Sequence, residues 1–163
     1  ANPVPEIWPH DAKAAGAFIV GTGRGDFPNQ INNSVCFPGI LKGALLVRAR
    51  KISDGMAIRC AHSIADYSEK KGINPENIVV KMDDEDVFAV EAADVAMQAI
   101  KEGLARITIT WDEAFKQAKA EIAASRALTQ KLMDSGFIKE PPQEFFNQAM
   151  DYAIEQIKNQ RSK

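Results

Sequence analysis

Residues 21–33 read GTGRGDFPNQINN and follow directly on the apolar residues AFIV at 17–20. A short apolar run bounded by glycine predicts a strand buried on both faces, as in a parallel sheet. Glycines allow the backbone of the following loop to turn sharply or to approach a ligand closely. The asparagines in the loop offer amides that both donate and accept hydrogen bonds. This stretch therefore predicts an α/β protein in which a strand ends in a polar, glycine-rich loop.

Composition and charge place the chain among globular proteins. It has 163 residues, 45% of them apolar and 26% charged, with a formal net charge of −2. The near-neutral charge argues against a nucleic-acid partner, and no apolar run approaches the roughly 20 residues that span a membrane. The two cysteines, Cys36 and Cys60, lie among apolar neighbours. Free thiols and a cytoplasmic location are therefore expected.

Helical periodicity dominates the chain after the loop. A short helical turn is predicted from Pro9, and Ser53 and Gly72 are placed to cap and to end one of the longer helices. Thr110 and Glu113 form the T-x-x-E pattern of a capping box at the start of another. The long helices are expected over residues 35–50, 54–71, 87–103, 111–135 and 143–159.

The predicted strand at 17–20 is too little sheet for so many helices. Residues 105–110 (ARITIT) alternate and predict only one more short extended piece. Two interpretations remain, a mostly helical bundle or a sheet whose other strands lie outside this chain. Because the sequence opens on ANPVPEI, which is typical of a strand turning into a loop, we expect a fragment or a processed product.

The glycines of the loop only superficially match a dinucleotide phosphate loop. That fingerprint requires G-x-G-x-x-G running into a helix, and here Asp26 occupies the place of the third glycine. A carboxylate there would repel a pyrophosphate. Residues 24–26 also spell RGD, an adhesion tripeptide, but an internal ion pair between Arg24 and Asp26 is the favoured interpretation.

Amide side chains gather at two predicted loop ends, at Asn2, Asn29, Gln30, Asn32 and Asn33. Ligands of open α/β sheets bind beyond the carboxyl ends of the strands, where these loops are expected to lie. Neutral amides suit a ligand that carries hydroxyl, carbonyl or carboxylate oxygens. The alternative is that these side chains only cap helices and turns.

Other candidate chemical groups have structural interpretations. The acidic residues 83–86 lack the spacing of a calcium loop and are expected to begin a helix, where its dipole favours negative charge. His10 and His62 have no partners at metal-ligand spacing. No nucleophile motif is visible.

Two segments together resemble a known family: ANPVPEI at 1–7 and AKAAGAFIVGTGRGDFPNQINNSVCFPGILKGALLVRARKISDGM at 12–56. They resemble the nicotinamide-binding domain of malic enzymes, in its compact microbial type. The resemblance is strongest over residues 1–62 and weaker over 73–106. Malic enzymes oxidise malate to pyruvate and carbon dioxide with NAD or NADP and with Mg²⁺ or Mn²⁺.

The resemblance implies roles for particular residues. Asn2 is implied to contact the nicotinamide ribose and the substrate, and Asn33 to contact both the substrate and the cofactor. Asn32, beside it, is implied in substrate binding. Further cofactor contacts are implied for the turn after the strand: Gly21, Thr22 and Gly23. Gly25 departs from the family, which usually has serine there.

The resemblance also implies what lies elsewhere. The acid/base pair, the metal ligands and the G-x-G-x-x-G loop of the family precede its ANP motif, so no catalytic residue or metal ligand is assigned here. The fold implied is the C-terminal portion of a Rossmann-type NAD(P)-binding domain with parallel strands, over 1–106, followed by a helical tail over 107–163. Alone, this chain is expected not to turn over malate.

The tail helices carry apolar residues at helical spacing, from Trp111 to Leu132 and from Phe145 to Ile157. Packing against the parent domain is favoured, and a subunit contact is the alternative. The expected partners are malate or pyruvate, the N-terminal part of the same enzyme, and a second subunit in a homodimer. Two other functions stay open, a non-catalytic nucleotide or organic-acid binding module and a helical interaction protein.

Overall fold

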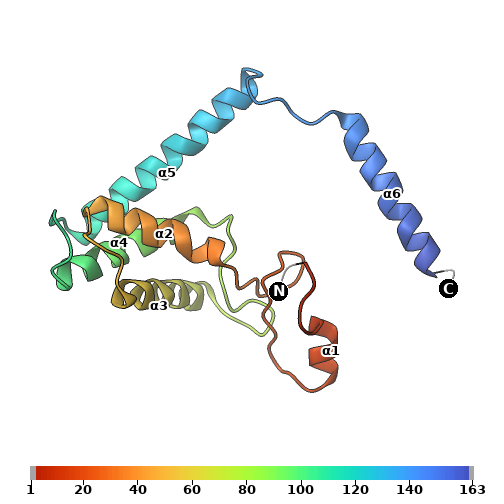
Figure 1. Cartoon of the computed structure of the whole chain (residues 1–163), viewed down its shortest axis with the longest axis horizontal. Coiled ribbons are helices and arrows are strands. Elements are labelled where there is room, and N and C mark those ends of the chain that lie inside the picture. Colours follow the sequence, from red (N-terminus) through yellow and green to blue (C-terminus); the bar gives the residue numbers. More distant parts are fainter. Residues whose placement is uncertain (1–2, 162–163) are drawn as a thin grey trace. The chain divides into compact units, whose positions relative to one another are not determined.

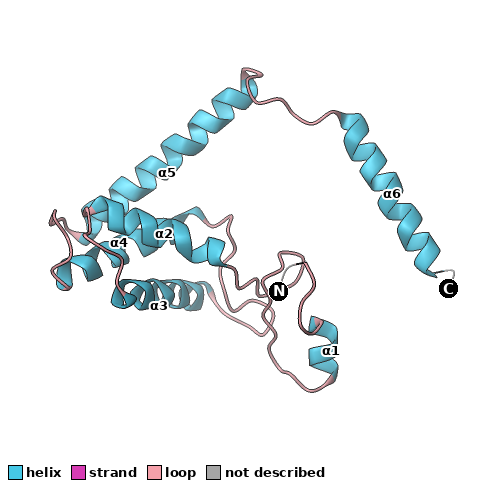
Figure 2. Cartoon of the chain, in the orientation of Figure 1, coloured by secondary structure: helices cyan, strands magenta, loops and turns pink. Residues whose placement is uncertain are grey.

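The computed structural model describes residues 3–161, and within them it contains six helices and no β-strand (Figures 1 and 2). The chain divides into two compact units, one ending at Ala123 and the other beginning at Ala124. Within the described part, no helix is long and apolar enough to cross a membrane. The helices are α1 (Pro9–Ala14), α2 (Asn33–Leu46), α3 (Asp54–Lys71), α4 (Glu85–Lys101), α5 (Trp111–Asp134) and α6 (Gln143–Arg161).

The predicted helix ends are confirmed at their caps. The Ser53 hydroxyl accepts a hydrogen bond from the Met56 N–H at 3.1 Å, and Gly72 ends α3 with a φ of 92°. Thr110 N–H donates to Glu113 Oε2 at 2.8 Å, while Glu113 N–H donates to Thr110 Oγ1 at 3.2 Å. These exchanges satisfy backbone donors that the first turn of a helix leaves without partners.

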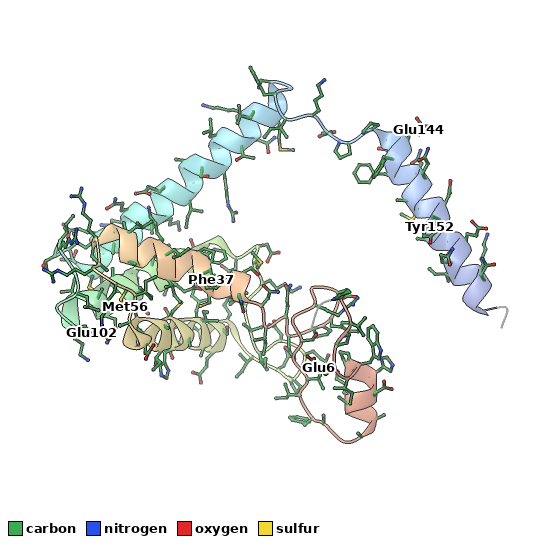
Figure 3. All side chains as sticks on the ribbon, in the orientation of Figure 1. Glu6, Phe37, Met56, Glu102, Glu144 and Tyr152 are labelled. Carbon is green, nitrogen blue, oxygen red and sulfur yellow. The ribbon has the colours of Figure 1, made fainter. Side chains whose placement is uncertain are left out.

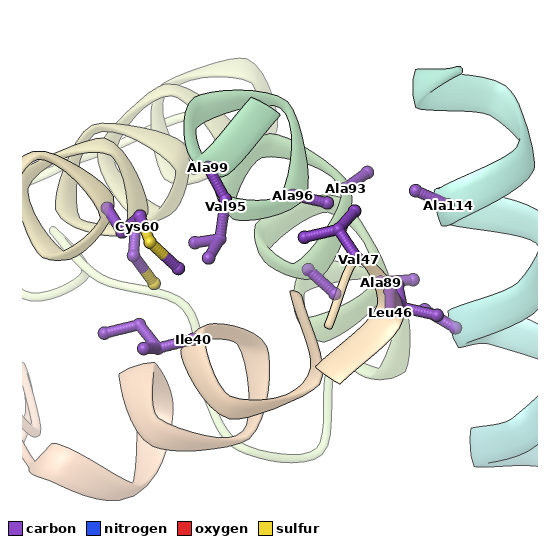
Figure 4. Close-up of a cluster of buried hydrophobic side chains, with 13 residues drawn as sticks. Ile40, Leu46, Val47, Cys60, Ala89, Ala93, Val95, Ala96, Ala99 and Ala114 are labelled. Carbon is purple, nitrogen blue, oxygen red and sulfur yellow. The ribbon is translucent and has the colours of Figure 1, made fainter. Parts of the chain in front are cut away.

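The first unit is held together by α2, α3 and α4, which share one hydrophobic core (Figure 4). The α4 helix contributes mostly small side chains to this core, including Ala92, Ala96 and Ala99. A Cβ atom added at Gly43 would lie 2.6 Å from the Ala92 carbonyl oxygen and 2.7 Å from the Val95 Cβ. The α2 and α4 backbones therefore approach closely because small residues face each other.

The start of α5 is fixed to this core by a polar cluster. Trp111 Nε1–H donates to Asp94 Oδ1 at 2.8 Å. The other carboxylate oxygen of Asp94 accepts hydrogen bonds from Arg59 and from the Ser63 hydroxyl, each at 2.6 Å. One carboxylate on α4 thus connects α3 with α5, and Ala114 of α5 is buried in the hydrophobic core.

The second unit, described by itself, consists of the end of α5, a connecting segment and α6. Gly136, at a φ of 75°, ends α5, and Ile138 N–H donates to the Leu132 carbonyl at 3.1 Å. The predicted final helix is confirmed as α6, and its apolar side chains are exposed, with Phe145 at 67% and Met150 at 63%.

The strand predicted at 17–20 is not formed in the described chain. Phe18 lies in a bend and is 78% exposed, and Ile19 is 44% exposed, so the predicted burial is not found among the described residues. A strand needs neighbouring strands for its backbone hydrogen bonds, and residues 3–161 supply none beside it. The predicted extended piece at 105–110 also forms no strand, and there the Arg106 N–H donates to the Val47 carbonyl.

Candidate functional site

The loop after residues 17–20 folds back on itself. Thr22 N–H donates to the Asn29 carbonyl at 3.2 Å, and Ile31 N–H donates to the Thr22 carbonyl at 2.8 Å. These two bonds form an isolated parallel bridge between Thr22 and Gln30. Gly21 lies so close to this partner segment that an added Cβ would meet Ile31 Cδ1 at 2.8 Å. The predicted cofactor turn is therefore held directly beside the NQINN segment.

Asn29 is an internal anchor of this loop. Its side-chain amide donates to the Val20 carbonyl at 3.1 Å and to the Pro75 carbonyl at 2.8 Å. Its Oδ1 accepts from the Ile78 N–H at 2.8 Å, and its backbone adopts a positive φ of 56° that asparagine tolerates better than most residues. Asn29 is only 6% exposed, and its side chain is hydrogen-bonded to the protein. It therefore shapes the loop, in agreement with the alternative that such asparagines serve turns and caps.

Asn32 caps α2. Its Oδ1 accepts from the N–H of Ser34 at 3.0 Å and from the Ser34 hydroxyl at 2.7 Å. Its Nδ2 donates to the Gly23 carbonyl at 3.1 Å, which ties the glycine turn to the start of the helix. An amide nitrogen has two hydrogens, so Asn32 keeps one for a ligand.

Asn33 is the predicted site residue whose amide is free. It is the first residue of α2 and is exposed, and it has no hydrogen-bond partner among residues 3–161. A pocket of about 430 Å³ opens beside it, lined also by Gln30 and by Phe37. Phe37, labelled in Figure 3, is 53% exposed. The N–H groups at a helix start carry partial positive charge, so a carboxylate is favoured at this position.

The remaining predicted site residues are the glycine turn at residues 21–23 and Asn2. The turn at residues 21–23 is joined to Asn32, the residue before Asn33, through the Gly23 carbonyl contact. Asn2 lies outside the described residues. The predicted ion pair of the loop is confirmed, because Arg24 donates to Asp26 at 2.8 and 2.6 Å. These hydrogen bonds lower the pKa of Asp26.

The acidic residues 83–86 begin a helix, as predicted. The α4 helix starts at Glu85, and the Asp84 carboxylate accepts hydrogen bonds from the Tyr67 hydroxyl at 2.9 Å and from Lys71. In the part of the chain that is described, no three His, Cys, Asp or Glu side chains are arranged to hold a metal ion. His10 on α1 lies 3.5 Å from Asp11, and His62 is exposed on α3.

The sequence did not predict the buried carboxyl of Glu91 on α4. Its residue exposure is 0%, its Oε2 accepts from the Cys60 thiol at 3.5 Å, and its Oε1 has no partner among the described residues. Burial raises the pKa of Glu91 to about 8, so this carboxyl is protonated at neutral pH. Its only signal in the sequence is an acidic residue inside the apolar run VFAVEAADVA.

Comparison with known proteins gives consistent matches. The profile of a family described as "Malic enzyme, NAD binding domain" matches residues 19–102. The bifunctional malic/malolactic enzyme of Bacillus subtilis is 43% identical over 119 residues, which cover 73% of this chain and 29% of that protein. A probable NADP-dependent malic enzyme of Rickettsia prowazekii is 37% identical over 132 residues, covering 72% of this chain and 17% of that protein.

A solved structure is similar over nearly the whole chain. The crystal structure of Entamoeba histolytica malic enzyme matches with 57% sequence identity and a TM-score of 0.91. The match covers 96% of this chain and 32% of that one. The chain thus spans about a third or less of the length of the relatives it matches.

Proposed function

Because the chain belongs to the malic enzyme family, as a portion of its Rossmann-type NAD-binding domain, we propose that it forms part of an enzyme that oxidatively decarboxylates malate to pyruvate and carbon dioxide with NAD or NADP. The chain spans 29% of the length of the Bacillus subtilis relative. The groups that this chain does not carry are therefore supplied by the remaining part of the enzyme. The rest of the active site, including the acid/base pair, lies there.

The free amide of Asn33 is the observation that carries this proposal. An amide can donate to a carboxylate oxygen of malate and accept from its hydroxyl without adding charge. Asn32 fixes the start of α2 to the Gly23 carbonyl, so Asn33 and the glycine turn keep a defined spacing. Hydride transfer requires the substrate carbon to lie about 3–3.5 Å from the nicotinamide ring. A fixed spacing between Asn33 and the glycine turn helps to hold the two reactants at this distance.

The cofactor and the metal are assigned to different parts of the enzyme. NAD or NADP supplies the hydride acceptor, and we assign its nicotinamide end to Asn2, Asn33 and the turn at 21–23. The close packing of Gly21 against Ile31 supports a turn whose backbone is fixed before the ligand arrives. We assign Mg²⁺ or Mn²⁺ to residues outside this chain, as the resemblance to malic enzymes implies.

The exposed segment at 17–20 supports a sheet completed by the rest of the enzyme. Its exposed Phe18 and Ile19 side chains suit a strand that joins parallel neighbours on both sides once the rest of the enzyme is present. We place the end of the NAD(P)-binding domain at residue 106. The family match, which ends at residue 102, supports a boundary in this region. The remaining residues, 107–163, form the helical extension.

The exposed face of α6 and the two cysteines bear on the partners and the location of the protein. The exposed apolar face of α6 supports a role in a homodimer, in which obligate interfaces are typically apolar. Both cysteines are free, and we propose the cytoplasm as the location because free thiols persist in reducing compartments.

A chimeric enzyme tests the proposal. This chain replaces the matched segment of the Entamoeba histolytica enzyme, and malate turnover is measured with NAD and with NADP. Replacing Asn33 with alanine removes a hydrogen bond worth about 1.5–3 kcal/mol to a charged ligand, so kcat/KM for malate should fall about 10- to 100-fold. The matched control is Asn147→Ala on α6, which should leave turnover unchanged. Equal activity of the two variants would contradict the assignment of Asn33.

A further inference from the structure

Arg24 connects two parts of the first unit that are distant in the sequence. Its guanidinium donates to both carboxylate oxygens of Asp26, at 2.8 and 2.6 Å, in a bidentate pair. The remaining nitrogen, Nη1, donates to the carbonyl of Pro3. The fork of donors thus joins the glycine loop to the segment at residues 3–8.

The same guanidinium lies against two aromatic rings. The Arg24 Cζ atom is 5.4 Å from the centre of the Trp8 ring and 5.6 Å from the centre of the Phe27 ring. The two rings are tilted by 57° with their centres 6.1 Å apart, so they form a corner around the charge. The Arg24 side chain is 24% exposed, and partial desolvation strengthens such cation–π contacts.

The loop end of this arrangement is continuous with the proposed substrate site. Arg24 follows Gly23, whose carbonyl accepts the side-chain hydrogen bond of Asn32, and Asn33 is the next residue. The far end of the arrangement is Pro3, which follows Asn2 in the sequence. One side chain therefore joins the described residues that follow Asn2 in the sequence to the loop that carries the other proposed contacts.

We propose that Arg24 is a positioning residue, which clamps the segment at residues 3–8 onto the glycine loop and so fixes the place of this segment beside the loop. This inference rests on the proposed function, because the clamp matters for turnover only if the loop holds the reactants. Arg24 touches neither reactant in this proposal. Lysine cannot replace it, since an ammonium lacks the planar fork that bonds Asp26 and Pro3 together.

The clamp itself is tested in the full chain by fluorine NMR with fluorotryptophan. The chain has two tryptophans, Trp8 and Trp111, and the Trp8→Phe variant assigns the two resonances. In Arg24→Ala the Trp8 resonance should move toward the position of free fluorotryptophan, while the Trp111 resonance stays in place as an internal control. A Trp8 resonance that does not move would overturn the clamp.

The consequence for turnover is tested in the chimeric enzyme. Arg24→Lys should lower kcat for malate at least 10-fold with little change in Tm, whereas Arg106→Lys, at an exposed arginine, should behave like the parent. A purely structural role for Arg24 predicts instead a lower Tm with kcat unchanged, and that outcome would refute the positioning role.

The two proposals fail in different ways. If Asn33→Ala impairs turnover and Arg24→Lys does not, the positioning role is wrong and the proposed function stands. If Arg24→Lys impairs turnover and Asn33→Ala does not, the assigned substrate contact is wrong. An inactive chimera would contradict the proposed function, and the fluorine spectra would then decide the clamp.

Discussion

The buried carboxyl of Glu91 should make the stability of the chain fall as the pH rises. The side chain is enclosed by α2 and α3, with Cys60 at 3.5 Å from its Oε2 and with Gly39 so close that a Cβ there would lie 2.3 Å from the Glu91 Cβ. The titratable groups that face it are the thiols of Cys60 and Cys36, whose pKa values are also raised by burial. No cation among the described residues is paired with this carboxyl.

The size of the effect follows from the difference between the pKa of Glu91 in the folded chain and in the unfolded chain. The pKa of Glu91 is about 8 in the folded chain and 4.5 as the ordinary value. Between these values the unfolded chain has lost the proton that the folded chain keeps, so the free energy of unfolding falls by about 1.4 kcal/mol per pH unit. The stabilisation is complete below pH 4.5, and about 5 kcal/mol of it is lost by pH 8. This loss is comparable to the total stability of many domains.

Urea unfolding at a series of pH values between 5 and 8 measures this dependence. Glu91→Gln keeps the shape of the side chain without the titration, so its curve should lack the slope, and at pH 8 the variant should be more stable than the parent. Glu155→Gln makes the same substitution at an exposed carboxyl on α6 and should keep the parent slope. Equal slopes for Glu91→Gln and the parent would refute the reasoning.

Three substitutions test the packing and the caps. Gly43→Ala should lower the free energy of unfolding in urea by about 1–3 kcal/mol, because its Cβ would lie 2.6 Å from the rigid Ala92 carbonyl; an unchanged free energy of unfolding would contradict the close approach of α2 and α4. Gly25→Ser should be tolerated and raise stability by up to about 1 kcal/mol in the same assay, since its Cβ meets only the mobile end of Gln30 at 3.1 Å; a marked loss would show a rigid neighbour. Thr110→Ala should cost about 0.5–2 kcal/mol of stability and some helical circular dichroism, whereas no change would mean that the capping box is not stabilising.

Helix boundaries could be predicted because their signals are local. Ser53, Gly72 and the pair Thr110 and Glu113 act on backbone groups within a few residues, so the sequence contains all the information that the caps need. The bidentate pair of Arg24 and Asp26 belongs to the same class. By contrast, the contacts of Arg24 with Pro3 and Trp8 join segments about twenty residues apart along the sequence. No local sequence pattern predicts such contacts.

The predicted strand at 17–20 is not formed among the described residues, because a strand depends on partners that are not local. The apolar run indicates burial, but burial requires neighbouring strands that the described residues lack, and Phe18 is exposed as a result. Asparagines posed a different difficulty, since the same residue type suits a ligand or a cap. Only the coordinates separate Asn29 and Asn32, which bond to the protein, from Asn33, whose amide is free.

The central claim is that this chain supplies nicotinamide and substrate contacts to a malic enzyme and needs the remainder of that enzyme to work. The most direct measurement is a titration of NAD and NADP into the purified chain, alone and joined to the remainder of the Entamoeba histolytica enzyme in the chimera. The account predicts weak binding and no malate turnover by the chain alone, with both binding and turnover present in the chimera. Tight cofactor binding by the chain alone, or no binding in either form, would contradict it.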